Sequence, residues 1–92
     1  MWQVYIVRCR TGELYTGCTI DLERRIEQHN RGSGSKFTRS RRPVVLLYHE
    51  QCGDRSSALK RENQIKRMSR VEKTRLALRP PQRPGRSSGS PG

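Results

Sequence analysis

Apolar positions along the chain predict three strands. Residues 2–9 are rich in aromatic and β-branched side chains, and residues 14–19 resume this pattern after the turn residues Thr11-Gly12. The two segments therefore predict a β-hairpin. A loop with glycines and serines is predicted at 31–43. Residues 44–51 are apolar almost throughout, which predicts a third strand, placed centrally in a sheet.

Three helices are predicted around these strands. The first runs from residue 22 to about residue 30, with Asp21 as its N-cap. The second spans about 56–67. Ser69-Arg70-Val71-Glu72 is a capping box that opens a third helix, which ends at about Leu78. The pattern therefore predicts a small α/β domain with the order β-β-α-β-α-α.

Composition separates this domain from a tail. Residues 79–92 contain no Leu, Ile, Val or Phe and are dominated by Pro, Gly, Ser and Arg. Such a segment has nothing to bury, so we expect a disordered basic extension after a domain at 1–78.

Charge indicates a polyanionic partner. The chain carries 20 Lys and Arg against 8 Asp and Glu, a net charge of +12. Three of these positive charges lie in the tail, so residues 1–78 alone carry +9. Nucleic acid, either DNA or RNA, is the expected partner. A basic membrane-surface protein is the main competitor, but no long basic amphipathic helix is evident.

Other classes fit the sequence poorly. No apolar run approaches the roughly 20 residues that a membrane span needs, and the N-terminus does not resemble a signal peptide. Cys9, Cys18 and Cys52 lack the paired spacing of zinc ligands. We therefore expect no membrane association, and free thiols in a reducing cytoplasm.

Two polar residues lie on the inner edge of the first predicted helix. Leu22 and Ile26 define its apolar stripe, and Arg25 and His29 form an i, i+4 pair along the buried edge of that stripe. A snorkelling arginine and a satisfied core histidine would explain them structurally. A functional pair is the alternative.

An acidic residue lies inside the apolar arc of the second predicted helix. Glu62 falls about 40° from Ala58, between Ala58 and the neighbouring apolar positions of that face. A carboxylate at an inward position needs a cation. An ion pair with one of the many arginines and a metal ion both satisfy this requirement.

Tyr5 and Tyr15 lie on the two strands of the predicted hairpin. An even loop would put them on opposite faces. A three-residue loop or bulge, with Cys9 opposite Tyr15, would put them on one face, and Gly12 suits the left-handed conformation of such a loop.

Together these residues resemble a known family. The motifs are Gln3-Val4-Tyr5, Tyr15-Thr16-Gly17, Asp21-Leu22-Glu23-Arg24-Arg25, His29-Asn30, and Ala58-Leu59 ahead of Glu62. This combination resembles the GIY-YIG nuclease superfamily, most of all its small, stand-alone, single-domain bacterial-type members. The resemblance covers about residues 2–77. It implies a three-stranded antiparallel sheet flanked by helices.

The resemblance also implies metal-dependent hydrolysis of a phosphodiester by an endonuclease. By position, Glu62 matches the residue that binds Mg²⁺ or Mn²⁺, and Arg25 the catalytic arginine. Tyr5 and Tyr15 match the two active-site tyrosines, and His29 a histidine found in part of the family. Tyr5 would position or deprotonate water, with Arg25 or the metal lowering its pKa.

The chain departs from the family pattern at three positions. Gln3 replaces a glycine, Thr16 occupies the middle of the second motif, and Cys18 stands where repair-type members often have a basic residue. We expect low sequence specificity. A nucleic-acid-binding module that keeps the fold and cleaves little is the alternative. The basic residues expected to hold the nucleic-acid backbone are Arg31, Lys36, Arg39, Arg41 and Arg42.

Overall fold

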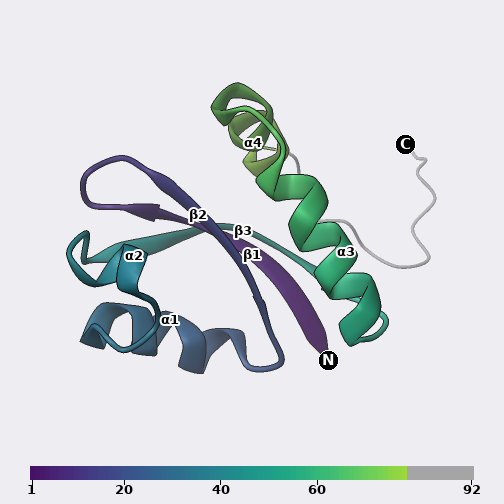
Figure 1. The fold of residues 1–92 in the computed structure, drawn as a ribbon, viewed down its shortest axis with the longest axis horizontal. Coiled ribbons are helices and arrows are strands. Elements are labelled where there is room, and N and C mark those ends of the chain that lie inside the picture. The colour runs from purple at the N-terminus through teal and green to yellow at the C-terminus, as the bar shows by residue number, and fades with distance from the viewer. Residues whose placement is uncertain (79–92) are drawn as a thin grey trace.

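A computed structural model describes residues 1–78, which form three strands and four helices (Figure 1). The strands are β1 (Trp2–Cys9), β2 (Leu14–Thr19) and β3 (Val44–Cys52), and the helices are α1 (Leu22–Arg31), α2 (Lys36–Arg39), α3 (Arg55–Lys66) and α4 (Arg70–Ala77). The predicted α/β class and the predicted strands and helices are confirmed. The predicted tail, residues 79–92, lies outside the described residues.

The prediction of an uninterrupted loop at 31–43 was wrong, because α2 lies within it. Ser35 caps this helix, and its hydroxyl accepts a hydrogen bond from the backbone N–H of Thr38 at 3.1 Å. A single helical turn is too short to show an amphipathic period, so the sequence pattern could not reveal it.

The sheet has the order β2-β1-β3, with both pairings antiparallel. The prediction that residues 44–51 form the central strand was therefore wrong. β3 is an edge strand, on which Val45 and Leu46 are 47% and 39% exposed. A bulge explains the misleading pattern: Ile6 pairs with Tyr48 but Val7 pairs with Leu46. At the bulge, the alternation of β3 side chains between the two faces of the sheet shifts by one residue. Apolar residues therefore occur at both odd and even positions of this strand.

The hairpin between β1 and β2 has the three-residue loop that was one of the two alternatives. The backbone N–H of Cys9 donates to the carbonyl of Glu13 at 2.8 Å, and Gly12 adopts φ +100°. Tyr15 pairs with Val7, not with Cys9 as that alternative assumed. The shift is two residues, so Tyr5 and Tyr15 still share a face.

Helices cover both faces of the sheet, with α1 and α2 on one side and α3 and α4 on the other (Figure 1). Because neighbouring strand residues point to opposite faces, β1 contributes to two cores. Val4 and Ile6 pack with Ala58 and Ile65 of α3. The residues of the other core are Tyr5, Val7, Cys9 and Val44, with Tyr15, Leu22 and Ile26 packed against them.

No helix within residues 1–78 is long and apolar enough to cross a membrane. The three cysteines are free thiols: Cys9 is buried, and Cys18 and Cys52 are half-buried. Cys18 lies on β2 at the α3 side of the sheet, where it becomes part of the site described next.

Candidate active site

Tyr5 and His29 form a buried pair between β1 and α1. The Tyr5 hydroxyl lies 2.9 Å from Nε2 of His29, and the two side chains are 2% and 0% exposed. Tyr5 faces Gly17 on β2, where an added Cβ would lie 2.5 Å from the Tyr5 oxygen. Gly17 therefore provides the space through which the Tyr5 hydroxyl reaches the β2 edge of the sheet.

The other nitrogen of His29 is held by α2. Nδ1 lies 2.8 Å from Oγ1 of Thr38, which is fully buried, and the Thr38 hydroxyl lies 3.4 Å from the carbonyl oxygen of Ser35. When the Thr38 hydroxyl donates its single proton to that carbonyl, its oxygen can only accept a hydrogen bond from the N–H at Nδ1 of His29. Nε2 is then the acceptor for the Tyr5 hydroxyl, which is the arrangement a base requires.

The charges around this pair favour a neutral histidine. Burial lowers the pKa of His29, and the nearby Arg25 guanidinium lowers it further. Burial raises the pKa of Tyr5, and so do Tyr15 and Glu62, while Arg25 acts in the opposite direction. The expected lowering of the Tyr5 pKa by Arg25 is thus outweighed by burial, so Tyr5 needs an acceptor such as His29 to lose its proton.

Tyr15 lies against the same histidine. Its ring meets the His29 ring edge-on, with centroids 5.3 Å apart, and stacks on Phe37 of α2 at 5.9 Å and 22°. Tyr15 therefore packs between the histidine and the basic loop.

Arg25 is half-buried on α1, one turn before His29. Within residues 1–78 its guanidinium forms no ion pair, although four other basic residues do. Its charge lowers the pKa of both Tyr5 and His29. Arg25 is thus available to a non-bridging phosphate oxygen.

Glu62 approaches from the opposite side of the sheet. Cys18 donates to its Oε1 at 3.4 Å, and Nζ of Lys66 lies 3.0 Å from its Oε2. Cys18 and Gly17 are neighbours on β2 and face opposite sides. Glu62 therefore lies beside β2 on the α3 side of the sheet, and its charge still raises the pKa of Tyr5 on the other side.

Glu62 offers a single carboxylate to a hard cation. Its carboxylate is 14% exposed, so it can bind an ion that keeps water on its other sides, as Mg²⁺ usually does. Burial and the neighbouring Glu62 raise the pKa of Cys18 to about 11, so in the absence of a metal ion its thiol is neutral and donates to the carboxylate. Within residues 1–78, no three His, Cys, Asp or Glu side chains form a larger cage.

The five residues predicted to bind the nucleic-acid backbone all lie on or beside α2 and the end of α1. Several of their side chains already contact carbonyl oxygens or carboxylates of the protein. Arg39 and Arg42 donate to the carbonyls of Gly32 and Arg39 at 3.2 and 2.8 Å. Arg41 lies 3.5 Å from Glu13, and Arg31 lies 3.7 Å from Glu27. Lys36 is exposed. Their role in binding nucleic acid stays a prediction.

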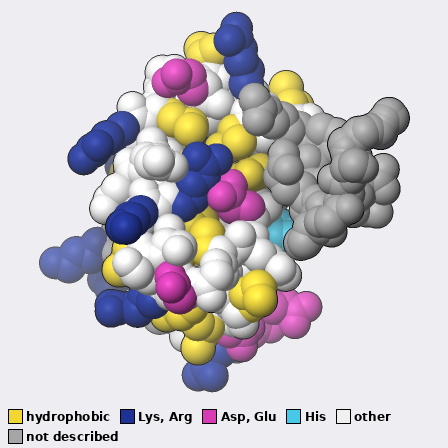
Figure 2. Space-filling view, turned by 90° about the vertical axis from the view of Figure 1, so that its right-hand side faces the viewer, with side chains coloured by type: hydrophobic (Ala, Val, Ile, Leu, Met, Phe, Trp, Pro, Cys, Tyr) yellow, Lys and Arg dark blue, Asp and Glu magenta, His cyan; other side chains and the backbone are white. Residues whose placement is uncertain are grey.

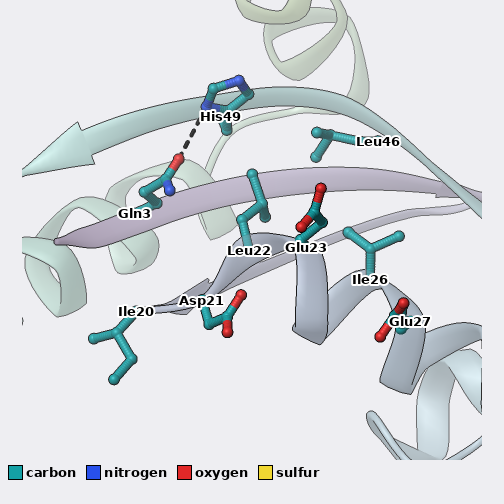
Figure 3. Close-up of a pocket in the computed structure, with 9 residues that line it drawn as sticks. All are labelled: Gln3, Ile20, Asp21, Leu22, Glu23, Ile26, Glu27, Leu46 and His49. Atoms are coloured by element: carbon teal, nitrogen blue, oxygen red, sulfur yellow. Dashed lines mark hydrogen bonds between the residues drawn. The ribbon is translucent and has the colours of Figure 1, made fainter.

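Basic side chains do not gather in one patch on the face that Figure 2 shows. On the face shown in Figure 2, Lys and Arg stand singly and alternate with acidic and hydrophobic side chains. A pocket at the start of α1 is in fact acidic (Figure 3): Asp21, Glu23 and Glu27 line it beside Leu46 and His49. None of the five predicted catalytic residues lines this pocket. The negative charges of its carboxylates would repel a phosphate group.

Several functional neighbours were missed by sequence reasoning. Thr38 lies in the predicted loop, and nothing local marks it as the partner of His29. Lys66 could have been found, because it lies one turn after Glu62. Gly34 packs against the His29 ring, where an added Cβ would lie 2.7 Å from Cγ.

Comparisons with known proteins show the relatives of this chain. Residues 1–75 match the sequence model of the GIY-YIG catalytic domain. The chain is 54% identical over 76 residues to UPF0213 protein DP2720 of Desulfotalea psychrophila, covering 82% of this chain and 69% of that protein. It is 52% identical over 73 residues to UPF0213 protein SSP2268 of Staphylococcus saprophyticus, covering 79% and 89%.

Solved structures show the same fold. The solution NMR structure of protein EF2693 from E. faecalis is 39% identical, has a TM-score of 0.56, and matches 79% of this chain and 78% of that one. The UPF0213 protein BH0048 from Bacillus halodurans is also 39% identical, with a TM-score of 0.52, over 83% of this chain and 82% of that one. With the family match over residues 1–75, these relatives show that the chain belongs to the GIY-YIG catalytic domain family.

Proposed function

We propose that this protein is a divalent-metal-dependent endonuclease that hydrolyses phosphodiester bonds in DNA with low sequence specificity, acting in the cytoplasm. The observation that carries the proposal is the buried hydrogen bond between Tyr5 and His29, beside an arginine without an ion pair in residues 1–78. The pair can accept a proton where the arginine can hold a phosphate.

In this reaction His29 accepts the Tyr5 proton at Nε2, and the Tyr5 oxygen takes a proton from the attacking water. Thr38 keeps the imidazole in the required tautomer. Arg25 binds a non-bridging phosphate oxygen and stabilises the charge that develops there. Tyr15 keeps the histidine in place.

Glu62 is the residue that would hold the metal. When bound, the ion polarises the phosphate and stabilises the leaving oxygen. Lys66 must first leave the carboxylate, which costs little because the lysine is half exposed.

The low specificity follows from the kind of contact available. The basic residues of 31–42 are suited to phosphate oxygens, which carry no sequence information. We expect affinity for DNA to fall steeply with salt concentration.

A second candidate is a binding module with little catalysis. The observation that favours it is the 3.0 Å contact between Lys66 and Glu62, which already neutralises the proposed metal ligand. The two candidates differ in one measurable property, which is divalent-dependent cleavage.

The test is a nicking assay on supercoiled, branched and single-stranded DNA with Mg²⁺, Mn²⁺ or chelator. We expect cleavage by the wild type in Mg²⁺ or Mn²⁺, and none by Glu62→Ala, which should still bind DNA because it removes a negative charge from a basic protein. Glu23→Ala is the matched control, since it removes an exposed carboxylate on α1. Cleavage by Glu62→Ala at the wild-type rate would refute the metal assignment. Tight binding without cleavage by the wild type would favour the binding module.

A further inference from the structure

Phe37 is an exposed aromatic residue at the rim of the candidate site. It is the chain's single phenylalanine, lies on α2, and is 38% exposed. Its ring stacks on Tyr15 at 5.9 Å, and Cζ of Arg41 lies 4.1 Å from the ring centroid. Tyr15, Phe37 and Arg41 thus form a continuous stack that leads from the candidate site toward the basic loop.

The backbone fixes this ring relative to the candidate base. Phe37 and Thr38 are neighbours on one helical turn, and they point in different directions. Thr38 is fully buried and bonded to Nδ1 of His29, while Phe37 faces outward. Any group that rests on Phe37 is therefore held at a defined place beside His29.

We propose that Phe37 is a stacking platform for one unpaired nucleobase next to the scissile phosphate. The inference rests on the proposed function and names its substrate class, DNA with an unpaired nucleotide at the cleavage site. In a duplex, neighbouring bases cover both faces of each base, so an exposed aromatic ring finds no partner there. Unpaired bases stack on aromatic side chains, and cationic residues nearby hold the backbone.

Without substrate, the guanidinium of Arg41 covers a face of the Phe37 ring. Its guanidinium donates to the carbonyl of Phe37 at 2.7 Å and lies 3.5 Å from Glu13. The cation–π contact and the ion pair are both partly exposed, so each is weak and can be exchanged for contacts with a nucleotide. In the proposed complex a base takes the place of Arg41 on the ring, and the released guanidinium turns to the neighbouring phosphate.

The test measures binding with the metal chelated, so that no cleavage is required. Three duplexes of one sequence are compared: fully paired, with a single unpaired adenosine, and with a single unpaired abasic nucleotide. The wild type should bind the adenosine bulge about 5- to 150-fold more tightly than the abasic bulge, the range of base–aromatic stacking. Equal binding of the two bulges by the wild type would overturn the platform.

Variants of Phe37 complete a double-mutant cycle between ring and base. Phe37→Ala and Phe37→Leu should both bind the two bulges equally, and Phe37→Tyr should keep the preference. Phe37→Leu retains apolar bulk against Tyr15, so its melting temperature shows whether the fold is intact. Val71→Ala, at a 60% exposed apolar residue of α4, is the matched control and should keep the preference. Retention of the preference by Phe37→Leu would overturn the proposal.

The proposed nuclease activity can fail separately. If the adenosine preference depends on Phe37 but no divalent ion supports cleavage, the platform stands and the nuclease proposal falls. If the protein cleaves DNA without any such preference, the platform alone is overturned.

Discussion

The two sides of the sheet hold their halves of the candidate site in different ways. On the α1 side, Tyr5, His29 and Thr38 are at most 2% exposed and are joined by hydrogen bonds of 2.9 and 2.8 Å. On the α3 side, Glu62 is 14% exposed, and its partner Lys66 is 50% exposed. The first half is rigid and preorganised, whereas the second keeps a partner that water or an ion can replace.

This difference suits the two roles proposed above, a base on the α1 side and a metal ligand on the α3 side. A base must be oriented before the reaction, because a buried network costs no reorganisation at that moment. A metal ligand must instead exchange partners each time an ion enters or leaves. Mutations should therefore affect the two sides differently.

On the α1 side of the sheet, the largest effect is expected for Arg25→Ala. Arg25 is proposed to stabilise charge on the phosphate, so its removal should lower the cleavage rate by about 10²- to 10³-fold, as for other preorganised donors. Single-turnover kinetics at saturating DNA measure this rate. Arg25→Lys keeps the charge without the planar fork, and we expect it to recover only part of the rate. An unchanged rate in Arg25→Ala would remove this residue from the mechanism.

Thr38→Val should disrupt the rigid side. It leaves Nδ1 of His29 buried without a partner, which should cost about 1–3 kcal/mol of unfolding free energy. Thr16→Val is the matched control, because Thr16 is 3% exposed and its hydroxyl has no partner within residues 1–78. We expect that control to be neutral or stabilising. Urea denaturation measures the unfolding free energy of both variants. An equal loss of unfolding free energy in Thr38→Val and Thr16→Val would contradict the hydrogen bond assigned between Thr38 and His29.

A smaller effect is expected from pH. The folded-state pKa of His29 is lowered by burial and by Arg25, whereas an unfolded histidine titrates near about 6.5. The unfolded chain therefore binds this proton more readily, so the neutral ring stabilises the fold fully above about pH 6.5. That contribution is lost as the pH falls through the folded-state pKa. The melting temperature of the wild type should be lower at about pH 5.5 than at about pH 7.5, and this difference should be smaller for His29→Gln.

The smallest stability effect is expected for Lys66→Ala. A half-exposed i, i+4 ion pair contributes about 0.5 kcal/mol or less, so the melting temperature should hardly move. The freed carboxylate should, however, bind Mn²⁺ more tightly, which isothermal titration calorimetry measures. Weaker Mn²⁺ binding would mean that Lys66 supports the site instead of competing for Glu62.

The sequence was sufficient for much of the fold. Caps located two of the helices, because Asp21 and Ser69 each accept a backbone N–H of the helix they precede. Asp54 caps α3 in the same way, but it was not identified as a cap from the sequence. The order of the strands in the sheet was harder to predict. Apolar residues on both phases of 44–51 mimic a strand buried on both faces, and only the bulge opposite Ile6 and Val7 explains them.

The candidate site was partly predictable for a similar reason. Helical phase placed Arg25, His29 and Glu62 at inward positions, since local geometry governs where a residue of a regular helix points. It could not pair His29 with Thr38 or Glu62 with Cys18. Those contacts join segments distant in sequence and depend on packing that no local pattern encodes.

The single turn of α2 has a consequence for how this protein can change. Thr38 on its inner side orients the histidine, while Phe37 on its outer side faces solvent. The proposed binding of a base by Phe37 and the proposed proton transfer by His29 therefore cannot change independently, because one insertion or deletion in 35–38 rotates both Phe37 and Thr38. Loop exchange between relatives should succeed only when residues 29–42 are moved as one block. In this small fold, the segment with the least regular structure is the one least free to vary in length.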